Sequence, residues 1–375
     1  MEQLLFLSEG RLNILDNGTP RVLTCQTIEK YKQRGREIQD RNAWKNQGAG
    51  AMFTGMYMGR ETQVTFPVTG VSKGPDDRII FAVNFERGGG IYFKSLDVNG
   101  LETPILVDMN MSFHEVDVNQ SGGVAVSTGG NSLERHIALL KVDDAYPQIV
   151  TEGDCCDFNP KWSRYNEDVL YYDSAGIGYD GAGRFTGFGP RSIYRLDTKN
   201  GELIEVLVGG KYDYYCPFED ANGNLHYIRR PFKQKSDKMT FVDYLKAPGK
   251  IFRAIGGWLD FFTRRYSGET LKTSGANPAV GNSKSPHQIF IDGNLLEADK
   301  MQQQNANAGD KNPGYAPRDW ELVVRTAEGE KVLHKSVMSY CVADCDGSIV
   351  YSNGKFVIAG ERVIPVHLAT GILAL

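Results

Sequence analysis

The sequence contains few cysteines and no hydrophobic run long enough to cross a bilayer. Six cysteines occur among 375 residues, and no apolar run approaches the roughly 20 residues that a transmembrane helix needs. The first residues carry an acid, Glu2, where a secretion signal needs cations, and the apolar run that follows has four residues. These features predict free thiols and a cytoplasmic location.

Neither sign of charge dominates the composition. The formal net charge is −4, and 41% of the residues are hydrophobic and 23% are charged, close to the values of globular proteins. Binding to nucleic acid needs a clustered basic surface that neutralises phosphates. The composition therefore predicts a folded, globular chain with no nucleic-acid partner.

Signatures of catalysis and of metal binding are not evident either. We expect no serine-hydrolase nucleophile elbow, because no hydrolase-sized domain follows the repeats described below. None of the six histidines stands at a metal-binding spacing such as His-x-x-x-His, and the pair Cys341 and Cys345 has no second pair. Cys155 and Cys156 adjoin a predicted strand, where a small buried residue is usual. The sequence therefore predicts no metal, no cofactor and no enzymatic activity.

A pattern of short strands and polar turns recurs along the chain. In each copy a turn rich in Asp, Asn or Gly leads into a short apolar strand, and another strand and a polar hairpin follow. The apolar strands begin near six residues: Leu4, Arg78, Gly123, Asp168, Asn224 and Ser348. Repeats of this length with three or four short strands each are typical of propeller blades. We therefore predict an all-β fold, a single six-bladed β-propeller over residues 1–375.

Polar hairpins join the outer strands of the repeats. Asp16-Asn17-Gly18 separates two alternating apolar stretches near the start of the chain, and Ala327-Glu328-Gly329 does so near its end. Asn-Gly between alternating hydrophobic residues is a strong signal for a hairpin. Residues 43–62 leave room for further strands, so a seventh blade stays open.

Two of the repeats resemble those of TolB-type β-propellers. The segments that carry the resemblance are Pro160-Lys161-Trp162-Ser163, which leads into Asp168–Tyr172, and Pro217–Tyr227. No copy keeps the Ser-Pro-Asp-Gly core of that family, so the resemblance is to the repeat class and not to TolB itself. It implies six blades closed by N- and C-terminal strands, and it implies no catalysis because a fold does not carry a function.

Three segments interrupt the repeats. Residues 26–45 read as a charged surface helix, with Ile28, Tyr31 and Ile38 as a thin apolar face that covers a blade edge. The second segment, Ser174–Pro190, contains a Gly-x-Gly-x-x-Gly pattern, but a strand follows it where a dinucleotide site needs a helix. We expect it to form the flexible lip of one blade.

The third and largest interruption is a helical insertion in the fifth blade, residues 232–285. Six apolar residues between Ile251 and Phe262 share one helical face. Residues 228–265 hold ten cations and three acids, a net charge of +7, which leaves −11 for the rest of the chain. This basic, amphipathic segment is the feature most typical of a functional surface.

The insertion has three interpretations. Its apolar face can dock into a protein partner, lie in an anionic membrane interface as a peripheral contact, or pack on the propeller's outer wall. We favour a non-catalytic scaffold that docks a protein partner. The candidate docking residues are Phe241, Leu245, Ile251, Phe252, Arg253, Ile255, Trp258, Leu259, Phe262, Arg264 and Arg265. Nothing in the sequence predicts an oligomeric state.

Acidic residues at comparable places in four repeats support an alternative. Asp117, Asp168, Glu219 and Asp344 could converge in the axial channel of the propeller, as in propeller enzymes or ligand-binding propellers. Their other interpretation is turn capping, which we favour. Convergence of three or more carboxylates or histidines within hydrogen-bonding reach of one another in the channel would favour an enzyme.

Overall fold

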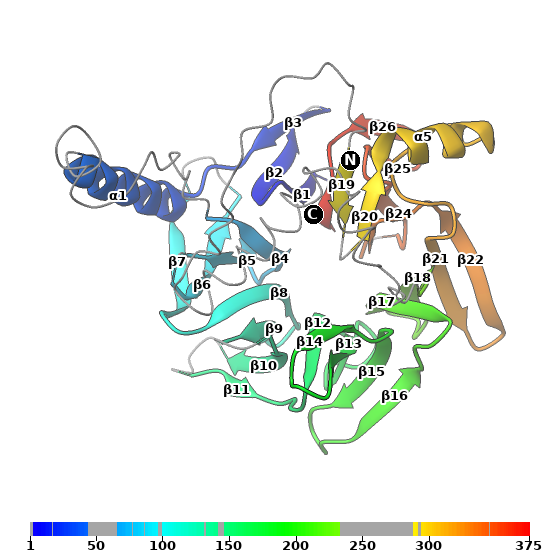
Figure 1. Ribbon diagram of the computed structural model, residues 1–375, viewed down its shortest axis with the longest axis horizontal. Helices are drawn as coiled ribbons and strands as arrows, with labels where there is room; N and C mark the ends of the chain where they lie inside the picture. Colours follow the sequence, from blue (N-terminus) through cyan, green and yellow to red (C-terminus); the bar gives the residue numbers. More distant parts are fainter. Residues whose placement is uncertain are drawn as a thin grey trace.

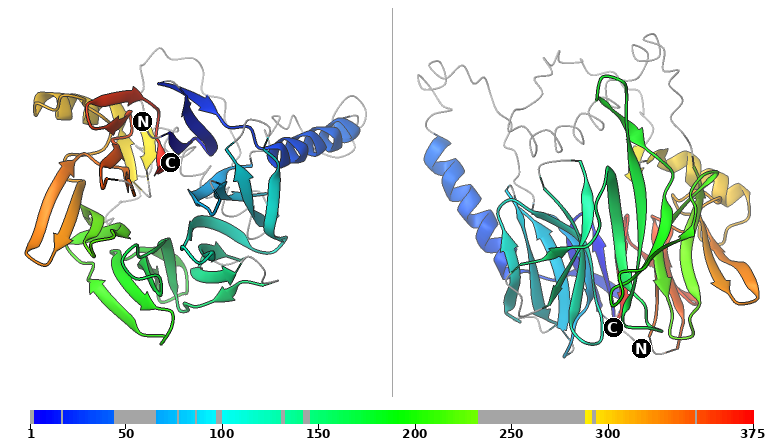
Figure 2. Two further views of the ribbon diagram at one scale, coloured as in Figure 1. Left: turned by 180° about the vertical axis from the view of Figure 1, so that it is seen from behind. Right: turned by 90° about the horizontal axis from the view of Figure 1, so that it is seen from below.

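Antiparallel strands make up most of the chain in the computed structural model. The described residues are 3–16, 18–43, 66–76, 78–85, 87–96, 100–130, 133–141, 146–232, 288–291, 294–344 and 346–375. The strands form sheets arranged radially around one axis, and both termini lie on the same side of the resulting disc (Figures 1 and 2). No helix among these residues is long and apolar enough to cross a membrane.

Four of the sheets have four strands each. Ordered from the axis outward, the first contains β27 (Thr370–Ala374), β1 (Leu4–Ser8), β2 (Arg11–Asp16) and β3 (Thr19–Val22). The second contains β4 (Val68–Lys73), β5 (Arg78–Asn84), β6 (Gly89–Ser95) and β7 (Glu102–Asp108). Another contains β17 (Tyr212–Glu219), β18 (Leu225–Pro231), β21 (Glu321–Thr326) and β22 (Gly329–Lys335). The last contains β23 (Ser339–Val342), β24 (Ile349–Ser352), β25 (Phe356–Ala359) and β26 (Arg362–Pro365).

A nine-stranded sheet joins two further sets of strands. One set is β8 (Ser112–Val118), β9 (Gly123–Gly129) and β10 (Arg135–Lys141), with β11 (Gln148–Ile149) beside β10. The other is β12 (Cys155–Trp162), β13 (Val169–Tyr179), β15 (Ser192–Asp197) and β16 (Leu203–Leu207), with β14 (Phe185–Phe188) beside β13. A single parallel pair, Arg135 with Cys156, links the two sets.

The strand starts predicted from the repeat are confirmed. The strands β1, β5, β9, β13, β18 and β24 begin within one residue of the predicted positions, and each is second from the axis in its set. Gly122, Gly223 and Gly347, which end the turns before three of these strands, have φ values of 84°, 78° and 69°. Only glycine adopts this left-handed region without steric cost, which explains the repeated glycines.

Apolar side chains fill the space between neighbouring sheets. Between the second and third sets of strands, for example, Ile80 and Ile91 pack with Phe113 and Val126, all of them inaccessible to solvent. The ring is closed because β1, from the N-terminus, pairs with β27, from the C-terminus, with Leu5 opposite Leu373. The number of six blades stays a prediction, since residues 44–65, most of the segment that could add a seventh, lie outside the described residues.

The helix α1 (Gln26–Ala43) lies at the rim of the second sheet (Figure 1). Ile28 is buried, and the Tyr31 ring stacks on Phe85 at 4.3 Å between centroids. At its N-terminus, Glu102 of β7 accepts hydrogen bonds from the backbone N–H groups of Gln26 and Thr27, at 2.9 and 2.7 Å. A carboxylate at this end satisfies free N–H groups and complements the helix dipole. The side chain of Ile38 lies outside the described part.

Two segments differ from the prediction. The stretch expected to form a flexible lip is a hairpin, because β13 continues to Tyr179 and pairs with β14. Asp180 closes its turn by accepting hydrogen bonds from the backbone N–H groups of Ala182 and Arg184, both at 2.9 Å. After the insertion, β19 (Gln288–Ile291) and β20 (Asn294–Glu297) form their own two-stranded sheet, and a helix not predicted from the sequence, α5 (Ala298–Asn307), follows.

The helical insertion predicted over residues 232–285 lies almost entirely outside the described residues. The described residues end at 232 and begin again at 288. The direct pairing of β18 with β21, Leu225 opposite Arg325, shows that the sheet of β17, β18, β21 and β22 is built across this gap. The predicted docking residues between Phe241 and Arg265 therefore stay predictions.

Candidate functional site in the axial channel

The innermost strands of all the sets surround an axial channel. A pocket of about 390 Å³ is lined by residues of β1, β4, β8, β12, β17, β23 and β27. A smaller pocket of about 130 Å³ shares Val71, Asn159, Lys161, Cys216, Ser339 and Gly371 with it. The shared residues make the two pockets parts of one channel. The larger pocket falls in the size range of small-ligand and peptide sites.

Bulges interrupt the inner strands where they line the channel. The pairing register shifts in β4 between Val68 and Gly70, and in β8 between Phe113 and Val116. The shifts in β12 and β17 occur beside Asn159 and Cys216, which have φ values of 50° and 53°. A bulge redirects a side chain at the cost of local strain, and such sites often lie next to functional residues.

Glu115 stands in the bulge of β8 and lines the larger pocket. Its Oε2 atom is buried and has no hydrogen-bond partner. Burying a carboxylate oxygen without a donor is costly. The larger pocket thus carries an unsatisfied acceptor that a ligand with a hydrogen-bond donor or a positive charge would complete.

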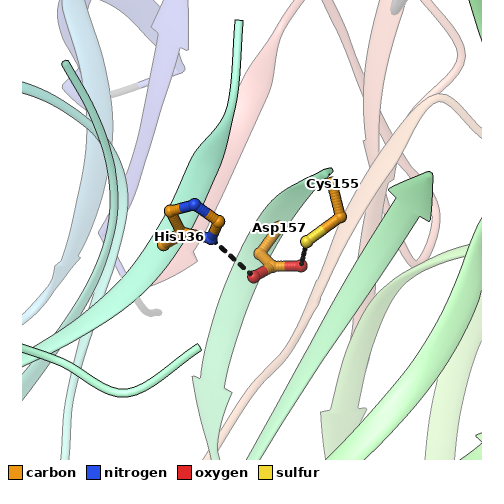
Figure 3. Close-up of side chains that lie close together, drawn as sticks. All are labelled: His136, Cys155 and Asp157. Atoms are coloured by element: carbon orange, nitrogen blue, oxygen red, sulfur yellow. Dashed lines mark hydrogen bonds and ion pairs between the residues drawn. The ribbon is translucent and has the colours of Figure 1, made fainter. Parts of the chain in front are cut away.

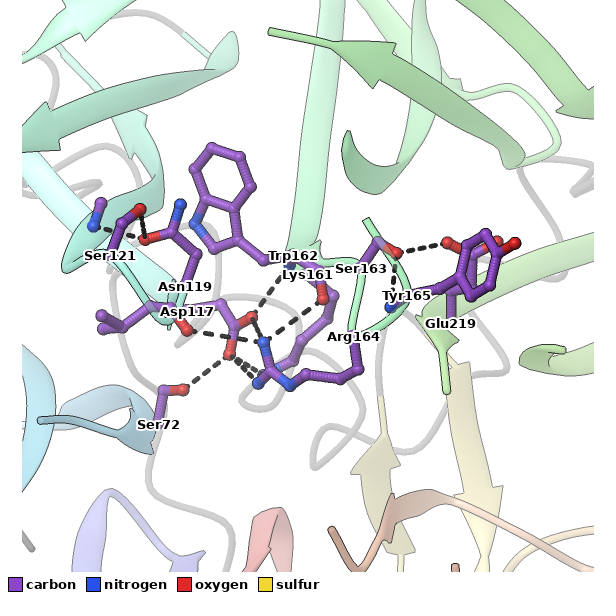
Figure 4. Close-up of polar contacts among 12 residues, drawn as sticks. Ser72, Asp117, Asn119, Ser121, Lys161, Trp162, Ser163, Arg164, Tyr165 and Glu219 are labelled. Carbon is purple, nitrogen blue, oxygen red and sulfur yellow. Dashed lines mark hydrogen bonds and ion pairs between the residues drawn. The ribbon is translucent and has the colours of Figure 1, made fainter. Parts of the chain in front are cut away.

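Asp117, two residues further along β8, has its carboxylate fully satisfied (Figure 4). Ser72 Oγ donates to Oδ1 at 2.6 Å, the backbone N–H of Trp162 donates to Oδ2 at 2.9 Å, and Lys161 Nζ lies 3.1 Å from Oδ1. Arg164 Nη1 lies 3.4 Å from Oδ2. Burial opposes ionisation, but the two cations and the donors outweigh it and hold the pKa of Asp117 below its usual range.

The other predicted channel acids are separate from one another. Asp344 lines the smaller pocket with Asp117, but it is exposed and lies 3.9 Å from Lys73 Nζ. Glu219 accepts hydrogen bonds from Ser163 Oγ and, at 2.9 Å, from the Tyr171 hydroxyl, and it lines neither pocket.

Asp168 lies in the turn before β13, where its backbone oxygen accepts two hydrogen bonds from Thr198, at 2.8 and 2.9 Å. The interpretation as a turn residue therefore agrees with its position. Of the four predicted acids, only Asp117 and Asp344 line a pocket of the channel. Glu115 lines the larger pocket, so these three carboxylates of the channel are divided between its two pockets.

One segment carries the sequence pattern of a nucleophile elbow, although no such elbow is expected from the sequence. Gly70-Val71-Ser72-Lys73-Gly74 matches Gly-x-Ser-x-Gly letter by letter. A nucleophile elbow needs the serine exposed on a turn between a strand and a helix. Ser72 instead lies in β4, is 1% exposed, and donates a hydrogen bond to Asp117 Oδ1, while β5 follows the turn. Ser72 therefore has a structural role, because it holds the Asp117 carboxylate.

Outside the channel, the structure brings together three residues that the sequence pattern did not connect. Nδ1 of His136 in β10, Sγ of Cys155 and a carboxylate oxygen of Asp157 in β12 lie within 4.8 Å of one another (Figure 3). Burial raises the pKa of Asp157, and burial followed by the Asp157 carboxylate raises that of Cys155 to about 12. Spacing along the chain misses this group because its members lie on two strands of different sets.

Comparison with known proteins gives matches to solved structures only. No family model matches the sequence, and no curated protein matches it. TolB from Acinetobacter baumannii shares 10% sequence identity, over 99% of this chain and 66% of that one, with a TM-score of 0.49. The tricorn protease shares 11% identity, over 100% of this chain and 34% of that one, with a TM-score of 0.47.

An oligogalacturonate lyase in complex with manganese is a third similar structure, with 12% identity, coverage of 63% and 57%, and a TM-score of 0.37. The chain spans about two thirds or less of the length of these three proteins. Two of these proteins are named as enzymes and the third is TolB. Because their functions differ, the similarity concerns the fold alone. The radial sheets and the closure between β1 and β27 make the chain a β-propeller.

Proposed function

We propose that the protein is a non-catalytic binding module that receives an extended segment of a protein partner in its axial channel. The single observation that carries the proposal is the buried, unpaired Oε2 atom of Glu115 in the lining of the larger pocket. A lysine, an arginine or a free amino terminus of the partner would supply the missing donor. Such a group explains why a carboxylate is held there without an internal partner.

The other polar groups of the channel favour binding over catalysis. Asp117 is held by Ser72, Lys161 and Arg164, so it is not available as an acid or a base. The lining combines apolar side chains such as Leu7, Val116 and Met338 with a few polar ones. This mixture is typical of a pocket that binds a ligand through shape and a small number of directed contacts. We also propose that the protein binds its partner in the reducing environment of the cytoplasm.

The proposal can be tested with a displayed library of random peptides, selected against the full-length protein. We expect the selected peptides to be enriched in Lys or Arg at one position. The variant Glu115→Gln should weaken their binding by about 10- to 100-fold, because it removes the charge but keeps the size of the side chain. Glu167→Gln, at an exposed position, is the matched control and should bind like the wild type.

Two results would overturn the proposal. One is a selection that yields acidic peptides, or peptides without any common charged position. The other is a set of selected peptides whose affinity is the same for the wild type and for Glu115→Gln. Docking through the basic insertion, residues 232–285, would instead give binding that depends on that segment and not on Glu115.

A further inference from the structure

The three residues His136, Cys155 and Asp157 face one another because of the register between two strands. β10 and β12 run parallel, with Arg135 opposite Cys156. Successive side chains of a strand point to opposite faces. Cys155 and Asp157, which flank Cys156, therefore share one face, and His136, next to Arg135, joins them there. Figure 3 shows the imidazole and the thiol on either side of the carboxylate.

The charge of Asp157 is not compensated by a basic side chain. Among the described residues, four aspartates are buried: Asp117, Asp157, Asp173 and Asp213. Three of them have a Lys or Arg nitrogen between 3.0 and 3.1 Å away, namely Asp117 with Lys161, Asp173 with Arg191, and Asp213 with Arg230. The nearest basic group to Asp157 is His136, whose Nδ1 lies 3.8 Å away, beyond hydrogen-bond distance. A buried carboxylate without such a partner takes up a proton, which agrees with the raised pKa of Asp157, or binds a cation that replaces the proton.

The imidazole of His136 is also incompletely satisfied. Its Nδ1 atom is buried, points toward Asp157, and has no hydrogen-bond partner. An unprotonated imidazole nitrogen is a strong ligand for transition metals, and a thiolate favours borderline or soft ions. The three groups are thus an imidazole, a thiol and a carboxyl, each a common ligand of zinc.

The distances are somewhat longer than the edges of a metal-centred tetrahedron. With bonds of about 2.0–2.3 Å, a tetrahedral zinc ion holds its ligand atoms about 3.3–3.6 Å apart. His136 Nδ1 lies 3.8 Å from Asp157 Oδ2, Cys155 Sγ lies 3.5 Å from the other oxygen, Oδ1, and one ligand atom from each residue lies within 4.8 Å of the other two. Binding of an ion by all three groups therefore requires the side chains to move closer together. The side chain of His136 is 20% exposed, which gives the ion a path from solvent.

A second layer of hydrogen bonds fixes the carboxylate. The backbone N–H of Ile137 donates to Thr151 Oγ1 at 2.8 Å, and this hydroxyl donates to Asp157 Oδ2 at 2.5 Å. Hydrogen bonds of this kind orient metal ligands and tune the affinity of the site.

We propose that His136, Cys155 and Asp157 form a binding site for a divalent transition-metal ion, zinc being the ion that suits this ligand set best. Three protein ligands leave a fourth position open to water or to a further ligand. The site lies between the third and fourth sets of strands and joins them where only one backbone pair connects β10 to β12. It is separate from the axial channel, since none of the three residues lines either pocket.

The test uses the full-length protein, stripped of metal with a chelator and titrated with Zn²⁺ alone by calorimetry. We expect the wild type to bind one Zn²⁺ ion per chain, and we expect this binding to depend on His136, Cys155 and Asp157. Cys155→Ser and His136→Gln should each lower the affinity at least about 100-fold, more than the 10- to 100-fold typical of residues that only support a ligand. Cys156→Ser is the matched control: its Sγ donates to the Leu133 carbonyl oxygen on the other face of β12, and its Zn²⁺ affinity should be unchanged.

Titration with Co²⁺ gives an independent readout. A cobalt–thiolate charge-transfer band should appear in the wild type and disappear in Cys155→Ser. Thr151→Val should keep the band but weaken binding by about 10-fold, because Thr151 positions the carboxylate without touching the ion. Since Cys155→Ser can unfold the chain, His136→Gln, at a partly exposed position, keeps the test decisive. The proposal is overturned if the wild type binds neither ion, or if its Zn²⁺ affinity is the same in His136→Gln.

Discussion

Lys161 Nζ lies 3.1 Å from Asp117 Oδ1, and this ion pair connects the inner strand β12 to the inner strand β8 of the preceding set. The aspartate is inaccessible to solvent, whereas the lysine side chain is 28% exposed and lines the channel. The pair therefore serves the packing of neighbouring sets of strands and leaves the lysine at the channel wall.

Asp117→Asn should destabilise the protein substantially. The change keeps the size of the side chain but leaves Lys161 and Arg164 without their shared counter-ion. Breaking a buried ion pair in this way costs about 3–5 kcal/mol, which we expect as a decrease in the free energy of unfolding in urea. Asp344→Asn is the control, because Asp344 is exposed and 3.9 Å from Lys73. It should change that free energy by less than about 0.5 kcal/mol. Equal effects of the two substitutions would contradict this account.

Acid should weaken the fold through the same residue. The pKa of Asp117 in the folded protein is lowered from its ordinary value of 3.8. The unfolded chain therefore takes up the proton first, so the contribution of Asp117 is complete above about pH 5 and is lost as the pH falls through the folded pKa. The free energy of unfolding, measured between roughly pH 6 and pH 2, should fall less steeply in Asp117→Asn than in the wild type. Parallel curves would exclude this role.

Glu102→Gln should loosen α1 and destabilise the second sheet. Glu102 Oε1 lies 3.0 Å from Lys94 Nζ, the two side chains are 1% and 0% exposed, and Glu102 also caps α1 at Thr27. Without the negative charge, Lys94 stays buried and unpaired, at an expected cost of about 3 kcal/mol in the free energy of unfolding. Hydrogen exchange should show faster exchange in the first turn of α1. Glu29→Gln, which breaks an exposed pair with Lys32 in the same helix, should leave both measurements nearly unchanged.

The organisation of the strands could be predicted from the sequence because its signals are local. A turn such as Asp220-Ala221-Asn222-Gly223 and the apolar strand after it are contiguous, and the left-handed Gly223 explains why the pattern repeats. The helix α5 has no such signal. Its two buried residues, Ala298 and Asn305, do not form an apolar stripe, and Asn305 is held by hydrogen bonds to the backbone oxygens of Gly314 and Ala316.

The candidate sites could be predicted only in part, because they depend on contacts between distant segments. The sequence offers Asp117 and Asp344 as candidate channel acids, and both line the smaller pocket, but it favours turn capping as their role. Only the position of Asp117 beside β12 shows a buried carboxylate with two cations. His136 and Cys155 come together through the register of one backbone pair. The bulges have a weak signal in the sequence. Asn159 and Cys216 both precede a proline, and a following proline disfavours the right-handed helical region for the residue before it.

Deletion of residues 234–281 should leave the propeller folded. β18 and β21 pair directly over five residues, so their sheet does not need the intervening segment for its hydrogen bonds. We expect a monodisperse protein whose melting temperature changes by only a few degrees, and whose affinity for channel-binding peptides equals that of the wild type. If the deletion abolishes binding while the protein stays folded, the partner docks on the insertion. Flotation with liposomes that contain anionic lipid, compared with neutral ones, then tests the membrane interpretation of the same segment.

The most direct measurement of the central claim is a double-mutant cycle between Glu115 and the basic group of a selected peptide. The four affinities combine wild type and Glu115→Gln with the peptide and its analogue, in which the basic side chain is replaced by an uncharged one of similar length. A direct contact at the buried Oε2 atom predicts a coupling energy of at least about 1.5 kcal/mol. A coupling energy of zero, with both single changes additive, would contradict the claim that Glu115 receives the partner in the axial channel.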